Sequence, residues 1–161
     1  MSLSRFIPVR MLTTAALVLG LAFTMSAAYT VSPAAPEAKA GVMSFSKAKN
    51  ALDAARTRKG SPYRYGAMGP HRFDCSGLTR WSFAKVGKKL PHSSSAQVSK
   101  TKRIKKSQRR KGDLVFFGSR TGVYHVSIYA GKNRIWHASR PGTPVRKSKI
   151  WTSRVFYGRV R

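Results

Sequence analysis

The sequence predicts an α+β fold in which N-terminal helices pack on an antiparallel β-sheet. Up to about residue 99, apolar residues recur at helical spacing between breaks made by Gly, Pro and Ser. From residue 113 onward they form a continuous run or alternate with polar residues, as in β-strands. Helices that precede a set of consecutive strands are typical of an α+β domain with an antiparallel sheet.

Residues 1–40 have the composition of a secretory signal peptide and a short linker. Arg5 and Arg10 precede an apolar run over residues 11–28, and Ala-Lys-Ala stands at residues 38–40. We expect cleavage after residue 40; residues 26–28 are the other candidate cleavage site, and an uncleaved membrane anchor is the alternative. The remaining residues, 41–161, suit one domain with one core.

Two longer helices and one short helix are expected in the first part of this domain. The first is predicted over residues 41–59, with Ser44 or Ser46 as its N-cap, and Gly and Pro then favour a loop before residue 73. The second opens at Cys75, because Asp74 is a good N-cap residue and is followed by apolar residues at helical spacing. A short helix over residues 96–99 precedes a basic segment, residues 100–112, which reads as a loop.

Strands are predicted over residues 113–117, 123–130, 134–139 and 155–160. A three-residue turn over 131–133 pairs Ala130 with Arg134. It then places His125 and His137 on one face as diagonal neighbours, about 7–8 Å apart at the backbone. A two-residue turn would shift the register by one and put the histidines on opposite faces.

The charge of the chain is strongly unbalanced. Lys and Arg number 32 against 4 Asp and Glu, for a formal net charge of +28. Such a charge implies an anionic environment or partner, which can be wall polymers, a lipid surface or nucleic acid. The export signal and the absence of a recognition motif argue against nucleic acid.

The lone cysteine, Cys75, cannot form an internal disulfide, so its role is either packing or chemistry. At a helix start, backbone N–H groups and the helix dipole stabilise a thiolate and can hold an oxyanion. His125 would then be the general base, and His137 would orient it. Each residue also has a purely structural interpretation, and His71 and His92 are left as structural. The histidines show no metal-ligand spacing, so we expect no metal and no cofactor.

Six motifs, in order, resemble those of the NlpC/P60 peptidases, over about residues 46–161. They are Gly60–Gly66 (GSPYRYG), Phe73–Leu78 (FDCSGL), Leu90-Pro91 with Ser95–Gln97, Gly112–Phe117 (GDLVFF), His125–Tyr129 (HVSIY) and Ile135–Ala138 (IWHA). The resemblance implies a papain-like NlpC/P60 fold and a catalytic domain over residues 41–161. It implies a secreted, cell-wall-associated cysteine endopeptidase that cuts peptidoglycan stem peptides, usually next to D-glutamate.

The resemblance also implies roles for individual residues. Cys75 would be the nucleophile, His125 the base and His137 the orienting residue. Tyr63 would contact the substrate beside the nucleophile, and Asp74 and Ser76 would bind a free peptide ammonium.

Two other functions stay open at this point. One is a papain-like peptidoglycan amidase, and the other is a non-catalytic cationic protein that binds the cell wall. We expect a monomer that uses its basic surface to bind anionic wall polymers and has no specific nucleic-acid partner.

Overall fold

The structure is a computed structural model that describes residues 41–161. The predicted signal peptide and linker, residues 1–40, lie outside the described residues. Within the described part of the chain, no helix combines the length and the apolar character that a membrane crossing requires.

Three α-helices form where the sequence predicts them. Their bounds are α1 Phe45–Arg56, α2 Cys75–Ala84 and α3 Ser94–Ser99. Each begins after a residue whose side chain accepts a hydrogen bond from a backbone N–H in the first turn: Ser44, Asp74 and Ser93. The choice between two N-caps for the first helix is therefore settled for Ser44, and the second helix opens at Cys75 as predicted.

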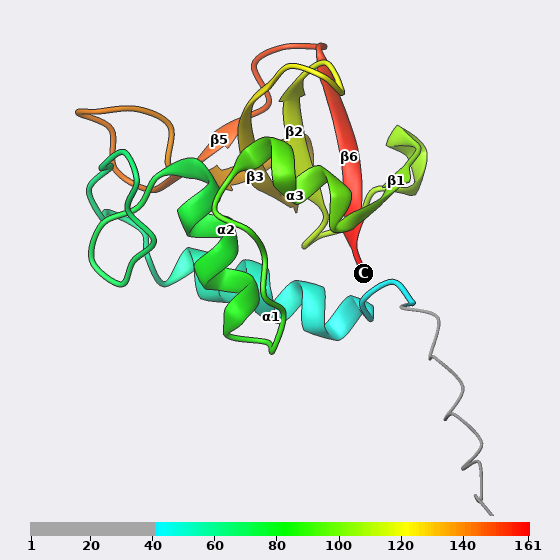
Figure 1. The fold of residues 1–161 in the computed structure, drawn as a ribbon, viewed down its shortest axis with the longest axis horizontal. Coiled ribbons are helices and arrows are strands. Elements are labelled where there is room, and N and C mark those ends of the chain that lie inside the picture. The colour runs from blue at the N-terminus through cyan, green and yellow to red at the C-terminus, as the bar shows by residue number, and fades with distance from the viewer. Residues whose placement is uncertain (1–40) are drawn as a thin grey trace, which may run out of the picture. The chain divides into compact units, whose positions relative to one another are not determined.

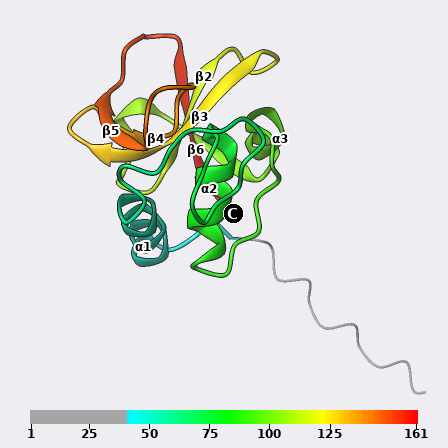
Figure 2. The same ribbon diagram turned by 90° about the vertical axis from the view of Figure 1, so that its left-hand side faces the viewer.

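The strands form one antiparallel sheet, with the order β1-β6-β2-β3-β4-β5. Their bounds are β1 Thr101–Ile104, β2 Leu114–Gly118, β3 Val123–Gly131, β4 Arg134–His137, β5 Arg146–Lys149 and β6 Val155–Val160. Helices α1 and α2 lie against one face of this sheet, and α3 lies beside β3 (Figures 1 and 2). The predicted α+β class is confirmed.

The two faces of the sheet carry separate apolar clusters. The face toward α1 and α2 buries Phe116, Val126 and Ile128 among the main core residues. The opposite face has a smaller cluster, which consists of Val115, Phe117, Tyr129, Ile135 and Tyr157. Side chains alternate between the two faces along a strand. His125 therefore points to the second face, whereas its neighbour Val126 points to the first.

Two segments differ from the prediction. The basic segment 100–112 was predicted as a loop, but it contains β1 and a 3₁₀ turn, η1 Lys106–Gln108. The sequence pattern does not predict β5 either. Both strands are the outer strands of the sheet, and an outer strand rich in Lys and Arg lacks the apolar alternation that reveals a buried one.

The β3–β4 hairpin reaches the predicted register by a different route. Its turn has two residues, Lys132 and Asn133, both with positive φ, and Gly131 pairs with Arg134. A register shift then leaves Ala130 as an extra, bulged residue, and Tyr129 pairs with Ile135. The bulge cancels the shift that a two-residue turn introduces, so the histidines still share a face. A second shift, at Phe117/Gly118, places Val123 in the helix-side core, on the face opposite to His125.

A buried ion pair joins the segment before β2 to the last strand. Asp113 is fully buried, and its carboxylate accepts hydrogen bonds from Nε of Arg159 at 2.9 Å and from the backbone N–H of Arg110 at 2.7 Å. This hydrogen-bonded pairing raises the pKa of the Arg159 guanidinium. Arg159 also donates to the carbonyl of Gln108 at 2.9 Å, which fixes the end of η1.

We predict that Asp113→Ala lowers the free energy of unfolding by about 3–5 kcal/mol, because it leaves a partly buried guanidinium without its carboxylate. Urea denaturation at neutral pH measures the loss. The control is Asp53→Ala, which removes a carboxylate that pairs with Lys49 and Arg56 on the exposed side of α1. This control should cost about 1 kcal/mol or less. Equal losses in the two variants would contradict the role of Asp113.

Candidate active site

The start of α2 is held by the carboxylate of Asp74. Its Oδ1 atom accepts hydrogen bonds from the backbone N–H of Gly77 at 2.6 Å and from the hydroxyl of Ser76 at 3.1 Å. These bonds satisfy donors that the first helical turn leaves free. The helix therefore begins at Cys75, which places the thiol on the first turn.

The loop before α2 packs directly on that turn. The N–H of Gly66 donates to Oδ2 of Asp74 at 2.9 Å, and the N–H of Asp74 donates to the carbonyl of Ala67, also at 2.9 Å. A Cβ atom at position 77 would lie 2.0 Å from that carbonyl oxygen. Only glycine allows this approach, which explains the Gly77 that follows Cys-Ser.

The Cys75 thiol lies against β3 beside His125. The side chain is partly exposed. Besides the N–H groups of its own turn, the backbone N–H of Val126 interacts with the sulfur, and Val126 directly follows His125. Cys75 and His125 line the same hollow, of about 400 Å³. Among residues 41–161 no hydrogen bond joins the sulfur to the imidazole; such contacts are often long before substrate binds.

The pKa of the Cys75 thiol is raised, not lowered. The helix start was expected to lower the pKa of the Cys75 thiol. In the structure, burial is the largest influence and raises that pKa, and the negative charge of Asp74 acts in the same direction. The N–H groups of Val126 and Ser76 oppose the change but do not reverse it. The resting side chain is thus favoured as a neutral thiol.

The two histidines are hydrogen bonded as the sequence predicted. Nε2 of His125 lies 3.1 Å from Nδ1 of His137, and Nε2 of His137 lies 3.0 Å from the hydroxyl oxygen of Ser148 on β5. When each Nε2 carries the proton, His125 donates to His137 and His137 donates to Ser148. Nδ1 of His125 is then left unprotonated. That nitrogen is then available to accept a proton from the thiol. No motif in the sequence indicates Ser148.

Trp151 covers this pair, and it was also missed from the sequence. Its ring stacks on Phe117 with centroids 4.1 Å apart, and it lies 5.5 Å from the His125 ring and 5.4 Å from the His137 ring. The histidines are only 5% and 3% exposed. Burial lowers the pKa of His125 to about 3, with a smaller effect from His137. Burial, followed by the charge of Arg146, lowers the pKa of His137 to about 4. Both rings are neutral at pH 7.

Of the remaining residues that the sequence singled out, Tyr63 and His92 line the hollow and His71 does not. Tyr63 lines the hollow, and its pKa is raised by burial and then by the nearby Cys75 and Asp74. His92, left as structural by the sequence analysis, also lines it, with Nε2 2.8 Å from Oδ2 of Asp74. His71 is exposed and is not among the lining residues.

A thiol at a helix start and a hydrogen-bonded histidine pair on the facing sheet define the papain-like arrangement. The family model described as "NlpC/P60 family" matches residues 60–159. The chain belongs to the NlpC/P60 family, and its α+β fold is that of the family's solved domains.

Curated relatives share this region. A "probable endopeptidase" of Corynebacterium glutamicum is 42% identical over 128 residues, which cover 74% of this chain and 60% of the relative. The "bifunctional muramidase/DL-endopeptidase CwlT" of Bacillus subtilis is 39% identical over 110 residues, covering 64% of this chain and 33% of the relative. The chain thus matches about three fifths of the first relative and one third of the second.

Solved structures show the same fold with two different functional descriptions. The "NlpC/p60 domain of peptidoglycan hydrolase SagA" is 32% identical with a TM-score of 0.65, covering 71% of this chain and 98% of that one. RipD of Mycobacterium tuberculosis, described as "a non-catalytic NlpC/p60 domain protein", is 28% identical with a TM-score of 0.61, covering 71% and 96%. Membership of the family therefore does not by itself decide between catalysis and binding.

We predict a loss of stability in acid from the buried histidine pair. Because the folded-state pKa values lie below the ordinary value of 6.5, the stabilisation is complete above pH 6.5 and falls as the pH drops toward about 4 and then 3. The loss is at most about 1.4 kcal/mol per pH unit for each histidine. Urea denaturation between pH 7 and pH 5 measures it. The double variant His125→Gln/His137→Gln should show a flatter pH dependence; an unchanged slope would mean that the pair is not buried as neutral imidazoles.

Proposed function

We propose that this chain is an exported cysteine endopeptidase that hydrolyses peptidoglycan stem peptides, at the bond between D-glutamate and the following diamino acid. The observation that carries the proposal is the hollow shared by Cys75 and His125, with Nδ1 of His125 left available by the bonds to His137 and Ser148. The names of the two relatives support the class of reaction, and "DL-endopeptidase" supports the choice of bond.

In this mechanism the sulfur of Cys75 attacks the carbonyl carbon of the scissile bond while its proton passes to Nδ1 of His125. The carbon–nitrogen bond then breaks, and the leaving amine takes that proton. Water, deprotonated by the same nitrogen, hydrolyses the resulting thioester and releases a carboxylate and the thiol. Because both resting groups are neutral, the proton moves during the attack and not before it.

The start of α2 can also stabilise the oxyanion. The N–H of Gly77 is bound to the Asp74 side chain, and the N–H of Leu78 to the Asp74 carbonyl. The N–H groups of Cys75 and Ser76 are the ones in this turn that interact with the sulfur. In the proposal these two N–H groups donate hydrogen bonds to the developing oxyanion.

Substrate binding is assigned to Tyr63, Asp74 and Ser76, all of which line the hollow. The Asp74 carboxylate is 6% exposed and already accepts four hydrogen bonds, one of them from Ser76. An incoming ammonium would therefore have to share this carboxylate with His92. Tyr63 is the most accessible of the three contacts in the proposal.

The setting of the reaction is part of the proposal. The sequence of residues 1–40 supports export, and the net charge of +28 supports retention at anionic wall polymers. We propose a monomer without a cofactor and without a specific nucleic-acid partner.

A non-catalytic wall-binding role is the second candidate. Two observations favour it: burial raises the pKa of the Cys75 thiol, and RipD is a non-catalytic member with the same fold. An amidase, which cuts between sugar and peptide, differs from the main proposal only in the bond that is broken.

We predict that Cys75→Ala abolishes the release of peptide fragments from purified peptidoglycan, because no other side chain in the hollow replaces the thiol. Mass spectrometry of the fragments identifies the bond: a new N-terminus on the diamino acid is expected, whereas free lactyl groups would indicate an amidase. The thermal unfolding temperature of the variant should match that of the parent chain. Undiminished release by the variant would refute the assignment, and no release by the parent chain would favour the binding role.

We further predict that Ser148→Ala lowers kcat about five- to tenfold with little change in KM. The substitution removes one hydrogen bond, worth about 1 kcal/mol, from the chain that fixes the His125 tautomer. Ser107→Ala, at an exposed serine on η1 that does not line the hollow, is the matched control and should leave kcat unchanged. A Ser148 variant with the parent kcat would show that the hydroxyl does not position the histidines.

A further inference from the structure

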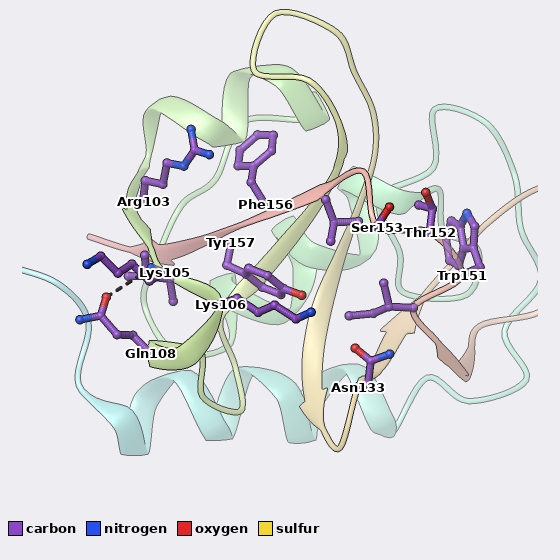
Figure 3. Close-up of a pocket in the computed structure, with 13 residues that line it drawn as sticks. Arg103, Lys105, Lys106, Gln108, Asn133, Trp151, Thr152, Ser153, Phe156 and Tyr157 are labelled. Carbon is purple, nitrogen blue, oxygen red and sulfur yellow. Dashed lines mark hydrogen bonds between the residues drawn. The ribbon is translucent and has the colours of Figure 1, made fainter.

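A large groove runs across the sheet face that is turned away from α1 and α2. Its volume is about 910 Å³. Figure 3 shows Lys105 at one end, Lys106 beside Tyr157 of β6 in the middle, and the segment Trp151–Ser153 at the other end. The groove does not include Cys75 or either histidine, so it is a separate site from the hollow.

The cations of this groove have no acidic partner in the described chain. Arg103, Lys105 and Lys106 are all exposed and line the groove from β1 and η1. The acidic side chains of residues 41–161 are all paired at other places: Asp53 with Lys49 and Arg56, Asp74 with His92, and Asp113 with Arg159. The groove is thus positively charged without internal compensation, and the complementary ligand is a polyanion.

The other residues that line the groove indicate the chemistry of the units between the anionic groups of that ligand. Asn133, Thr152 and Ser153 contribute an amide and two hydroxyls, and the Trp151 ring is 51% exposed. Side chains of this kind bind the hydroxyl-rich units of a sugar or polyol, whereas Lys and Arg bind phosphate. The Arg103 guanidinium lies over the Phe156 ring at 5.5 Å. Because Phe156 packs in the helix-side core, this guanidinium is turned away from Tyr157 in the middle of the groove, and the phosphate contacts are left to Lys105 and Lys106.

We infer that this groove binds a phosphodiester-linked sugar or polyol polymer, with the phosphates on Lys105 and Lys106. The inference rests on the wall location included in the proposed function, but not on the chemistry of Cys75. At its far end the groove reaches Trp151, and the same side chain lines a second hollow with His125 and His137. This end of the groove therefore lies next to the histidine pair.

Binding of poly(glycerol phosphate) to the full chain tests the inference. The variant Lys105→Gln/Lys106→Gln should bind at least tenfold more weakly at 0.1 M salt. The slope of log affinity against log salt should fall by about two. The matched control, Lys85→Gln/Lys89→Gln, removes the same charge from exposed positions outside the groove and should change affinity less than threefold. Equal losses in both variants would show diffuse attraction and overturn the inference.

The tryptophan fluorescence of the chain provides a second, local measurement. Poly(glycerol phosphate) should quench the emission of the exposed Trp151, and Trp151→Phe should abolish that quenching. Trp81→Phe, at a partly buried ring on α2, should preserve it. Quenching that persists in the Trp151 variant would place the polymer elsewhere.

Two further experiments distinguish this ligand from other polyanions and separate groove binding from peptidase activity. Single-stranded oligonucleotide and polyglutamate of matched charge should bind more weakly; tighter oligonucleotide binding would assign the groove to nucleic acid and overturn the ligand class. The groove variant Lys105→Gln/Lys106→Gln should cleave a soluble stem peptide at the parent rate while being retained less on purified walls. Absence of cleavage by the parent chain would refute the peptidase proposal and leave the groove result standing.

Discussion

The carboxylate of Asp74 holds the candidate active site together. It accepts hydrogen bonds from Gly66 in the preceding loop, from Ser76 and Gly77 in the first turn of α2, and from His92 beyond that helix. A buried carboxylate is stable only with such donors, so the four bonds fix these segments relative to one another. Cys75 is the next residue in the chain, and the position of its sulfur follows from this one side chain.

The chemical state of the site is decided by burial more than by charge. A chain of net charge +28 favours anions, yet burial outweighs this effect at Cys75 and keeps the thiol neutral. For the histidines the influences agree: burial beneath Trp151 disfavours imidazolium at both rings, and the positive charge of Arg146 adds to this effect at His137. The protein thus has a base that is ready to accept a proton at neutral pH, opposite a thiol that still carries one.

The parts of the site that local chemistry determines were predictable. Asp74 is an N-cap by residue type, and the alternation of β3 assigned His125 to one face. The hairpin shows the limit: the three-residue turn was wrong, and the shared face is correct because the bulge at Ala130 restores the register. A bulge depends on which residues pair across strands, which alternation within one strand does not reveal. His92, Ser148 and Trp151 escaped prediction for the same reason, since each acts on a residue distant in the sequence.

The edge strands link the fold to the second site. β1 and β5 lack apolar alternation because each pairs on one side only and displays Lys and Arg to solvent. Between the segments that follow these strands, η1 and residues 150–153, the outer face of the sheet is only partly covered, and the groove occupies that opening. Because the described carboxylates are all used to fix structure, none is left to neutralise the groove. The shortage of acidic residues therefore leaves a local, uncompensated positive surface, and Trp151 connects that surface to the histidine pair.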